Sequence, residues 1–148
     1  MWEFAKDWAQ IAPGLTPVVA LFAVLLAWRQ LALNRANQRE TTAKATFREY
    51  LKLAVEHPEL SAGNYETVVR DGRLEQYEWF VGYFLWAAEE LFEFAPKEDV
   101  WGRNLQMLAD YHCAYFKNSS DFMAKESGTY SAKTQALIKR AIASGAGS

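Results

Sequence analysis

The sequence contains few of the residues that most often carry chemistry. Among its 148 residues there is one cysteine, Cys113, and only two histidines, His57 and His112. A single cysteine excludes an internal disulfide and any zinc site built from cysteines. The chain also lacks a glycine-rich phosphate loop, a Gly-x-Ser-x-Gly nucleophile elbow and a His-Glu-x-x-His metal motif. We therefore predict no catalytic, cofactor-binding or metal-binding residue.

Helix-breaking residues are missing from a long N-terminal part of the chain. Neither glycine nor proline occurs between Pro17 and Pro58. Pro13 and Pro17 suit the first turn of a helix, where a missing amide hydrogen costs least. We therefore predict one unbroken helix from about Thr16 to His57.

Charge is missing from the first part of this helix. The eighteen residues from Ile11 to Trp28 carry no charged side chain. About twenty helical residues cross the ~30 Å hydrocarbon core of a bilayer. We predict a transmembrane helix over residues 11–33, preceded by a short external N-terminus over 1–10. A cytosolic helical bundle over 34–143 and a disordered tail over 144–148 complete the predicted organisation.

Two other interpretations of the apolar run are a cleavable secretory signal and a buried helix of a soluble protein. A cleavable signal has a basic start and a small-residue cleavage site. Here the segment before the run has two acidic residues, Glu3 and Asp7, and one basic residue, Lys6. After the run, the bulky Trp28 is incompatible with a small-residue cleavage site. An uncleaved anchor is therefore favoured, and the buried core helix stays as the alternative because the run is short.

The basic residues around the run predict its orientation. Only Lys6 precedes it, whereas residues 29–48 carry five basic side chains and one acid. Because basic residues stay on the cytoplasmic side, we predict a single-pass protein of the bacterial inner membrane with the N-terminus outside. The basic block also fits the anionic lipids of the cytoplasmic leaflet. The predicted lipid-interface residues are Trp2, Trp8, Trp28, Arg29, Arg35 and Arg39.

A stripe of residues lies along one side of this helix, at steps of three and four residues. Its first part consists mainly of small side chains, and its second part mainly of amide side chains. Small residues at such spacing let membrane helices approach closely, and amides form hydrogen bonds between them. We therefore predict self-association through this stripe, and a pore that gates by dewetting is a further hypothesis. The alternative is a plain anchor, because alanines are common in any helix. The stripe comprises Ala12, Thr16, Ala20, Ala23, Ala27, Gln30, Asn34, Asn37 and Thr41.

The rest of the chain predicts an all-α fold, since no useful stretch alternates with the period of a strand. Helices are expected over about 73–95, 100–117 and 131–143, with a connection over 58–72 and a loose stretch over 118–128. The helix over 73–95 is rich in aromatic residues on nearly every side, which is typical of the central helix of a bundle. One of its faces contains Leu74, Tyr77, Val81, Phe84, Ala88, Leu91 and Ala95, and a second contains Trp79, Tyr83 and Trp86.

Two groups of polar residues are candidates for a catalytic or metal site. Each histidine follows an arginine by nine residues, Arg48 before His57 and Arg103 before His112. Helical HEPN-like ribonucleases use an Arg–His pair at short spacing. Nine helical residues turn through about 900° and place the pair on opposite faces, so a buried role is favoured for His112.

The other group is the run of carboxylates at Glu89, Glu90 and Glu93. No histidine stands three residues after any of them, as the metal sites of helical bundles require. We interpret the run as the solvated edge of a helix, facing Lys133 and Lys139. Cys113 is predicted to be a small core residue.

Segments 47–58 (FREYLKLAVEHP) and 77–90 (YEWFVGYFLWAAEE), with Tyr130-Ser131, resemble small bacterial proteins of unknown function that have one N-terminal span and a cytosolic helical domain. The layout also resembles the CRISPR-associated accessory membrane proteins, which assemble as rings through an N-terminal span and a degenerate HEPN-like bundle. The layout implies a homo-oligomer in the lipid bilayer.

From these patterns we predict a self-associating inner-membrane protein, such as a pore-forming or membrane-perturbing effector of antiviral defence. The alternative is a non-catalytic adaptor that tethers a cytosolic partner, for which an exposed apolar or acidic groove is expected. The net charge of −2 indicates no specific nucleic-acid partner.

Overall fold

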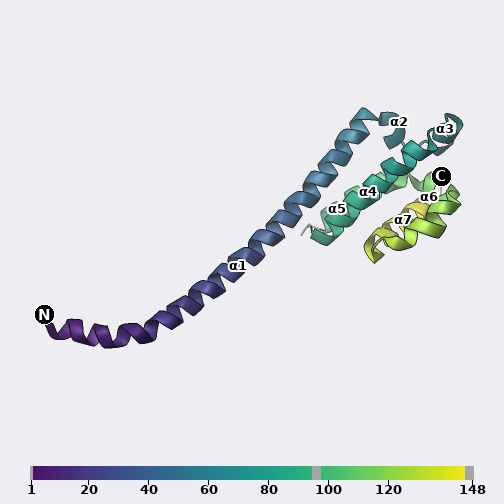
Figure 1. The fold of residues 1–148 in the computed structure, drawn as a ribbon. Coiled ribbons are helices and arrows are strands. Elements are labelled where there is room, and N and C mark those ends of the chain that lie inside the picture. Colours follow the sequence, from purple (N-terminus) through teal and green to yellow (C-terminus); the bar gives the residue numbers. More distant parts are fainter. Residues whose placement is uncertain (1, 95–97, 146–148) are drawn as a thin grey trace. The chain divides into compact units, whose positions relative to one another are not determined.

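The computed structural model describes the backbone of residues 2–94 and 98–145, and the side chains of residues 17, 19–94 and 100–145. Helices connected by short turns make up this described part, and no strand occurs in it, so the predicted all-α class is confirmed (Figure 1). The elements are α1 (Trp2–Glu56), α2 (Pro58–Ser61), α3 (Tyr65–Arg70), α4 (Leu74–Phe94), α5 (Glu98–Tyr111), α6 (Cys113–Asn118), the π-helix η1 (Phe122–Glu126), the 3-10 helix η2 (Ser127–Thr129) and α7 (Ala132–Ser144).

The chain divides into two compact units, Met1–Gln38 and Arg39–Ser148. The helix α1 contributes to both, because its last eighteen residues, 39–56, belong to the second unit. We call Arg39–Ser148 the helical domain. The predicted boundary between span and bundle, at residue 33, lies five residues before the boundary between these units.

The helix α1 begins earlier than the sequence predicts. It starts at Trp2 instead of near Thr16, so the predicted N-terminal segment 1–10 is also helical. Each proline removes only one amide hydrogen, and the helix continues through Pro13 and Pro17 at the cost of a bend. The first turns of α1, drawn in purple in Figure 1, are bent in this way.

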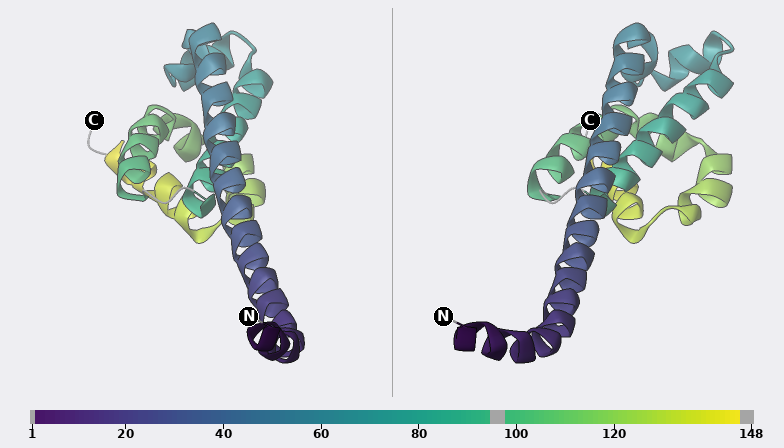
Figure 2. Two further views of the ribbon diagram at one scale, coloured as in Figure 1. Left: turned by 90° about the vertical axis from the view of Figure 1, so that its left-hand side faces the viewer. Right: turned by 60° about the vertical axis from the view of Figure 1, so that its left-hand side comes forward.

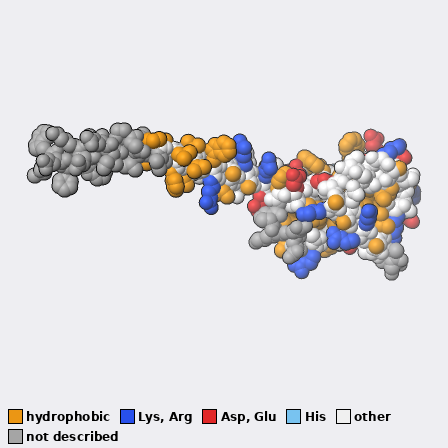
Figure 3. All heavy atoms as spheres, turned by 90° about the horizontal axis from the view of Figure 1, so that it is seen from below, with side chains coloured by type: hydrophobic (Ala, Val, Ile, Leu, Met, Phe, Trp, Pro, Cys, Tyr) orange, Lys and Arg blue, Asp and Glu red, His pale blue; other side chains and the backbone are white. Residues whose placement is uncertain are grey.

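The apolar part of α1 is exposed along its described length. From Val19 onward α1 contains a stretch long and apolar enough to cross a membrane, with a mean hydropathy of 1.2, and none of that stretch is buried inside the structure. Apolar side chains cover this part of α1 on the face seen in Figure 3, and Lys and Arg side chains follow it. A core helix of a soluble domain is mostly buried, whereas this stretch is a candidate membrane span by its length and composition.

The core of the helical domain is built on α4. The first predicted face of this helix is confirmed, because its residues from Tyr77 to Leu91 are buried. Leu74 is half-buried, and Ala95 lies outside the described residues. Figure 2 shows α4 beside α7 in both views, and α7 also packs on α5 and α6. The buried residues of α4 are Tyr77, Phe80, Val81, Phe84, Leu85, Ala87, Ala88 and Leu91.

The last turns of α1 pack on α4 through aromatic rings. The ring of Tyr50 lies 5.4 Å from Phe80 and 5.2 Å from Phe84, measured between centroids. Phe47 packs edge-on against Trp101 of α5 at 5.6 Å. These contacts bury Phe47 and Tyr50, whereas the neighbouring Leu51 is exposed.

Three predicted segments differ from the structure because local hydrogen bonds form short helices in them. The connection 58–72 contains α2 and α3, and Asn64 caps α3 by accepting a hydrogen bond from the amide of Thr67. The stretch 118–128, predicted to be loose, contains η1 and the start of η2. The single helix predicted over 100–117 is broken at His112, between α5 and α6.

The last helix is close to its prediction over 131–143. Ser131 caps α7, and its side chain accepts a hydrogen bond from the amide of Thr134. Leu137, Ile138 and Ala141 of α7 are buried. The predicted tail begins inside α7 at Ser144, and residues 146–148 lie outside the described part.

Candidate functional site

A prominent surface feature in the described part of the helical domain is the second aromatic face of α4. The sequence predicts that Trp79, Tyr83 and Trp86 help to make α4 a central helix, but this face is not covered. The side chain of Trp79 is 75% exposed and that of Trp86 is 51% exposed, while Tyr83 is half-buried. The prediction is wrong for Trp79 and Trp86, because the core packs on the Phe84-bearing face of the helix, whereas Tyr83 packs partly against the core.

These aromatic residues line a groove of about 620 Å³. One wall is the exposed face of α4, and the other comes from η1 and the residue that follows η2. The rings of Tyr83 and Trp86, both on the α4 wall, pack edge to face with their centroids 5.7 Å apart. The lining residues are Glu75, Glu78, Trp79, Gly82, Tyr83, Trp86, Glu126 and Tyr130.

The groove is acidic as well as aromatic. Its lining includes Glu75, Glu78 and Glu126 and contains no lysine or arginine. Burial raises the pKa of the Glu78 carboxyl, and the negative charges of Glu126, Asp121 and Glu75 raise it further. Lys125, a neighbour in sequence, forms an exposed ion pair with Asp121 at 3.2 Å. The carboxylates of the groove therefore repel one another without a compensating cation among the lining residues.

The predicted stripe of α1 is exposed wherever its side chains are described. Ala20, Ala23 and Ala27 are exposed, and so are Gln30 and Asn34. The side chains of two other stripe residues, Ala12 and Thr16, lie outside the described residues. Asn37 and Thr41 are also exposed, and each makes an interaction within the structure.

The predicted lipid-interface residues fall into two groups. Trp28 is 77% exposed, and Arg29 and Arg35 are exposed beside it, while the side chains of Trp2 and Trp8 lie outside the described residues. Arg39 instead belongs to the helical domain, where its guanidinium lies 5.5 Å from the centroid of the Phe94 ring. This contact ties the start of the domain to the end of α4.

His112 is a core residue, as predicted. Its imidazole is fully buried among aromatic rings, and its Nδ1 forms a hydrogen bond of 2.7 Å with the hydroxyl of Tyr77. Its Nε2 has no partner within the described part of the chain. Burial lowers the pKa of His112 to about 4, so the ring is neutral at physiological pH. Arg103 is exposed on α5 and so does not share this buried site.

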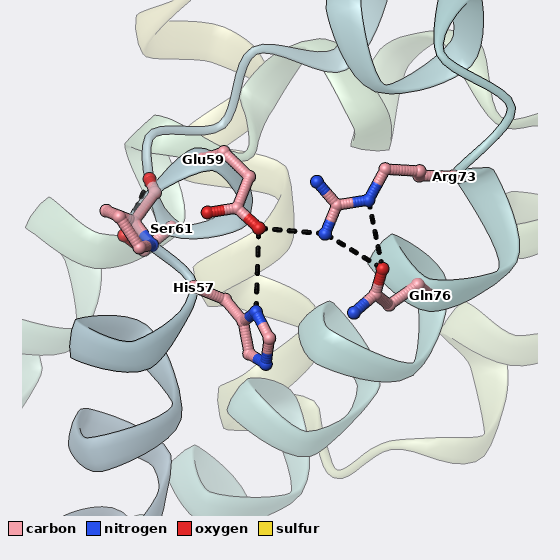
Figure 4. A network of polar contacts seen from close by, with 6 residues as sticks. His57, Glu59, Ser61, Arg73 and Gln76 are labelled. Carbon is pink, nitrogen blue, oxygen red and sulfur yellow. Dashed lines mark hydrogen bonds and ion pairs between the residues drawn. The ribbon is translucent and has the colours of Figure 1, made fainter.

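The other histidine, His57, belongs to a polar network at the surface (Figure 4). Its Nδ1 lies 3.5 Å from the carboxylate of Glu59, which also accepts a hydrogen bond of 2.8 Å from the guanidinium of Arg73. Arg73 donates further hydrogen bonds to the side-chain oxygen of Gln76. The hydrogen bond from Arg73 lowers the pKa of Glu59. The network links α2 to the start of α4.

The carboxylates at the end of α4 also have structural partners. Glu89 accepts a hydrogen bond of 2.8 Å from the amide of Ser131, and Glu90 accepts one of 3.0 Å from the hydroxyl of Thr46. Glu89, Glu93 and Lys133 line one shallow hollow, as predicted for Lys133. No group of three or more His, Cys, Asp or Glu side chains that could hold a metal ion occurs within the described residues. Cys113 is half-buried and is not a member of the core.

Comparison of the chain with protein-family models, curated proteins and solved structures finds no match. The resemblance to single-span bacterial proteins therefore stays a prediction. The acidic aromatic groove is the site that sequence reasoning missed. The signal for it is the second aromatic face of α4, but one of its three carboxylates, Glu126, comes from the stretch predicted to be loose.

Proposed function

We propose that this chain is a single-pass protein of the bacterial inner membrane whose helical domain is a docking module on the cytosolic side. The observation that carries this proposal is the exposure of Trp79 and Trp86 in an acidic groove of the helical domain. Exposed aromatic residues in a groove are typical of interaction sites, because they gain most from desolvation by a partner. The protein is thus a membrane-tethered adaptor.

The anchor and the orientation follow from α1. Its described apolar part is long enough to cross a bilayer and is exposed, so lipid is its natural surrounding. The exposed Arg29 and Arg35 lie in the second half of this part, and they favour the cytosolic side for the chain that follows. Among the groove residues, carboxylates and phenols occur without histidine, cysteine or serine, which supports binding over catalysis.

In-cell photo-crosslinking tests the docking function. A photoreactive amino acid in place of Trp86 is expected to form a covalent adduct with one discrete partner. The matched control is the same substitution at Val69 of α3, which is 45% exposed and lies outside the groove. Adducts of equal yield at both positions, or none at Trp86, would contradict the adaptor.

A second function, self-association in the membrane, is favoured by the stripe on α1. Ala20, Ala23, Ala27, Gln30 and Asn34 follow one another at steps of three, four, three and four residues, and all are exposed. This spacing keeps them on one side of the helix, where small side chains permit close approach of a second helix. A pore would require such an oligomer.

Substitutions in the stripe test self-association. Ala23→Leu combined with Ala27→Leu adds bulk to the contact and is expected to reduce the particle to a monomer in mild detergent, measured by light scattering. Ala32→Leu makes the same chemical change on the opposite side of α1, because nine helical residues beyond Ala23 turn through about 900°. An oligomer that survives the double substitution, or a monomeric parent protein, would remove this second function.

A further inference from the structure

The shape of the groove indicates an elongated occupant. Its α4 wall extends from Glu75 to Trp86. At ~1.5 Å per residue, this wall is about 16 Å long. A small cation would occupy only part of that length, whereas an extended segment of about five residues or three turns of helix matches it.

The charge of the groove selects a basic occupant. Glu75 and Glu78 lie at the N-terminal end of the α4 wall, and Glu126 faces the groove from η1. Burial raises the pKa of Glu78, and repulsion by neighbouring carboxylates, among them Glu126 and Glu75, raises it further. A bound cation relieves this repulsion, whereas an acidic partner increases it, so complementarity favours lysine and arginine.

The aromatic residues select the same chemistry. The guanidinium of arginine stacks on an indole face within about 6 Å of its centroid and pairs with carboxylates at the same time. The domain already contains one such contact, since Arg39 lies 5.5 Å from the centroid of Phe94. In the groove, Trp79 and Trp86 offer exposed indole rings with no arginine among the lining residues.

We infer that this groove binds a basic segment of a partner protein, with arginine or lysine side chains lying against Trp79 and Trp86 and paired with Glu75, Glu78 and Glu126. The inference rests on the proposed docking function and names the chemistry of the partner. The acidic end of the groove receives the basic residues, and the Trp86 end also accepts an apolar side chain. The segment therefore carries both kinds of residue.

Gly82 allows the groove to be closed without a change to the core. It lies in the middle of α4 and lines the groove, and a Cβ atom added there would meet no atom within 4 Å. Gly82→Leu therefore fills the open space, and it also replaces a poor helix former by a good one. Gly102→Leu is the matched control, because Gly102 is also helical, has the same free space and lies outside the groove.

The test is a selection from a display library of random twelve-residue peptides on the full-length protein in nanodiscs of zwitterionic lipid. Peptides enriched in arginine or lysine together with apolar residues are expected. The selected peptide is then measured by fluorescence anisotropy. Its Kd is expected to rise at least tenfold for Gly82→Leu and about fivefold for Glu78→Gln, as for the loss of one exposed ion pair. Gly102→Leu is expected to bind like the parent protein.

Enrichment of neutral or acidic peptides, no enrichment, or equal binding by Gly82→Leu would overturn the inference. The result is separable from that of the docking function. If crosslinking at Trp86 captures a partner while basic peptides fail, the adaptor stands and the assigned chemistry is wrong. If neither experiment succeeds, both are wrong.

Discussion

Replacing Gly63 by alanine is expected to lower the free energy of unfolding of the helical domain by about 3–5 kcal/mol. Gly63 has a φ of +70° between α2 and α3. An added Cβ would lie 1.7 Å from the carbonyl oxygen of Tyr111 and 2.5 Å from its carbonyl carbon. Because these are backbone atoms at the end of α5, no side-chain rotation relieves the overlap. Urea unfolding of the full-length protein in detergent micelles, followed by near-ultraviolet circular dichroism, measures the change.

Gly72 provides the control for this prediction. It has nearly the same backbone conformation, with a φ of +68°, but an added Cβ would meet nothing within 4 Å. Gly72→Ala therefore isolates the cost of the left-handed conformation, about 1 kcal/mol. Equal losses for the two variants would show that the α2–α3 segment does not pack on the end of α5 as described.

The stability of the domain is expected to fall in mild acid because of His112. Burial lowers the pKa of this histidine from 6.5 to about 4. Above pH 6.5 the ring is neutral in both the folded and unfolded states, so it contributes no pH dependence there. Between pH 6.5 and pH 4 only the unfolded state binds the proton, which lowers the unfolding free energy by about 1.4 kcal/mol per pH unit. The loss totals about 3 kcal/mol and levels off below pH 4.

His112→Phe separates this effect from the titration of carboxylates. The variant cannot take up the proton, so the stability advantage of the parent protein over it is expected to fall by about 3 kcal/mol, to zero or below, between pH 7 and pH 4. It is also less stable at pH 7, by about 1–3 kcal/mol, because the hydroxyl of Tyr77 loses the partner it has at 2.7 Å. Parallel stability curves for the two proteins would contradict the buried, neutral state of His112.

Most of the helical architecture follows from the sequence because its signals are local. The glycine- and proline-free stretch gives the long α1, and the period of Tyr77, Val81 and Phe84 identifies the buried face of α4. The short helices could not be predicted in this way. At the break between α5 and α6, for example, His112 forms a buried hydrogen bond with Tyr77, thirty-five residues away in sequence, and no local pattern reports such a contact.

Only the α4 side of the groove could be predicted from the sequence. Trp79, Tyr83 and Trp86 form an evident aromatic face, but whether another helix covers such a face depends on tertiary packing. Glu126 and Tyr130 complete the groove from a segment more than forty residues farther along the chain than Trp79. The position of Glu126 depends on the π-helix η1, and no periodic pattern in the sequence predicts a π-helix.

The proposed function depends on α1 being an uncleaved membrane anchor. Alkaline carbonate extraction of bacterial membranes tests this anchoring most directly. The full-length chain is expressed in a bacterium, its membranes are washed at high pH, and the mass of the protein is then measured. We expect the protein to stay in the membrane pellet with its N-terminal apolar run intact. Release into the wash, or a mature chain that has lost this run, would contradict the account.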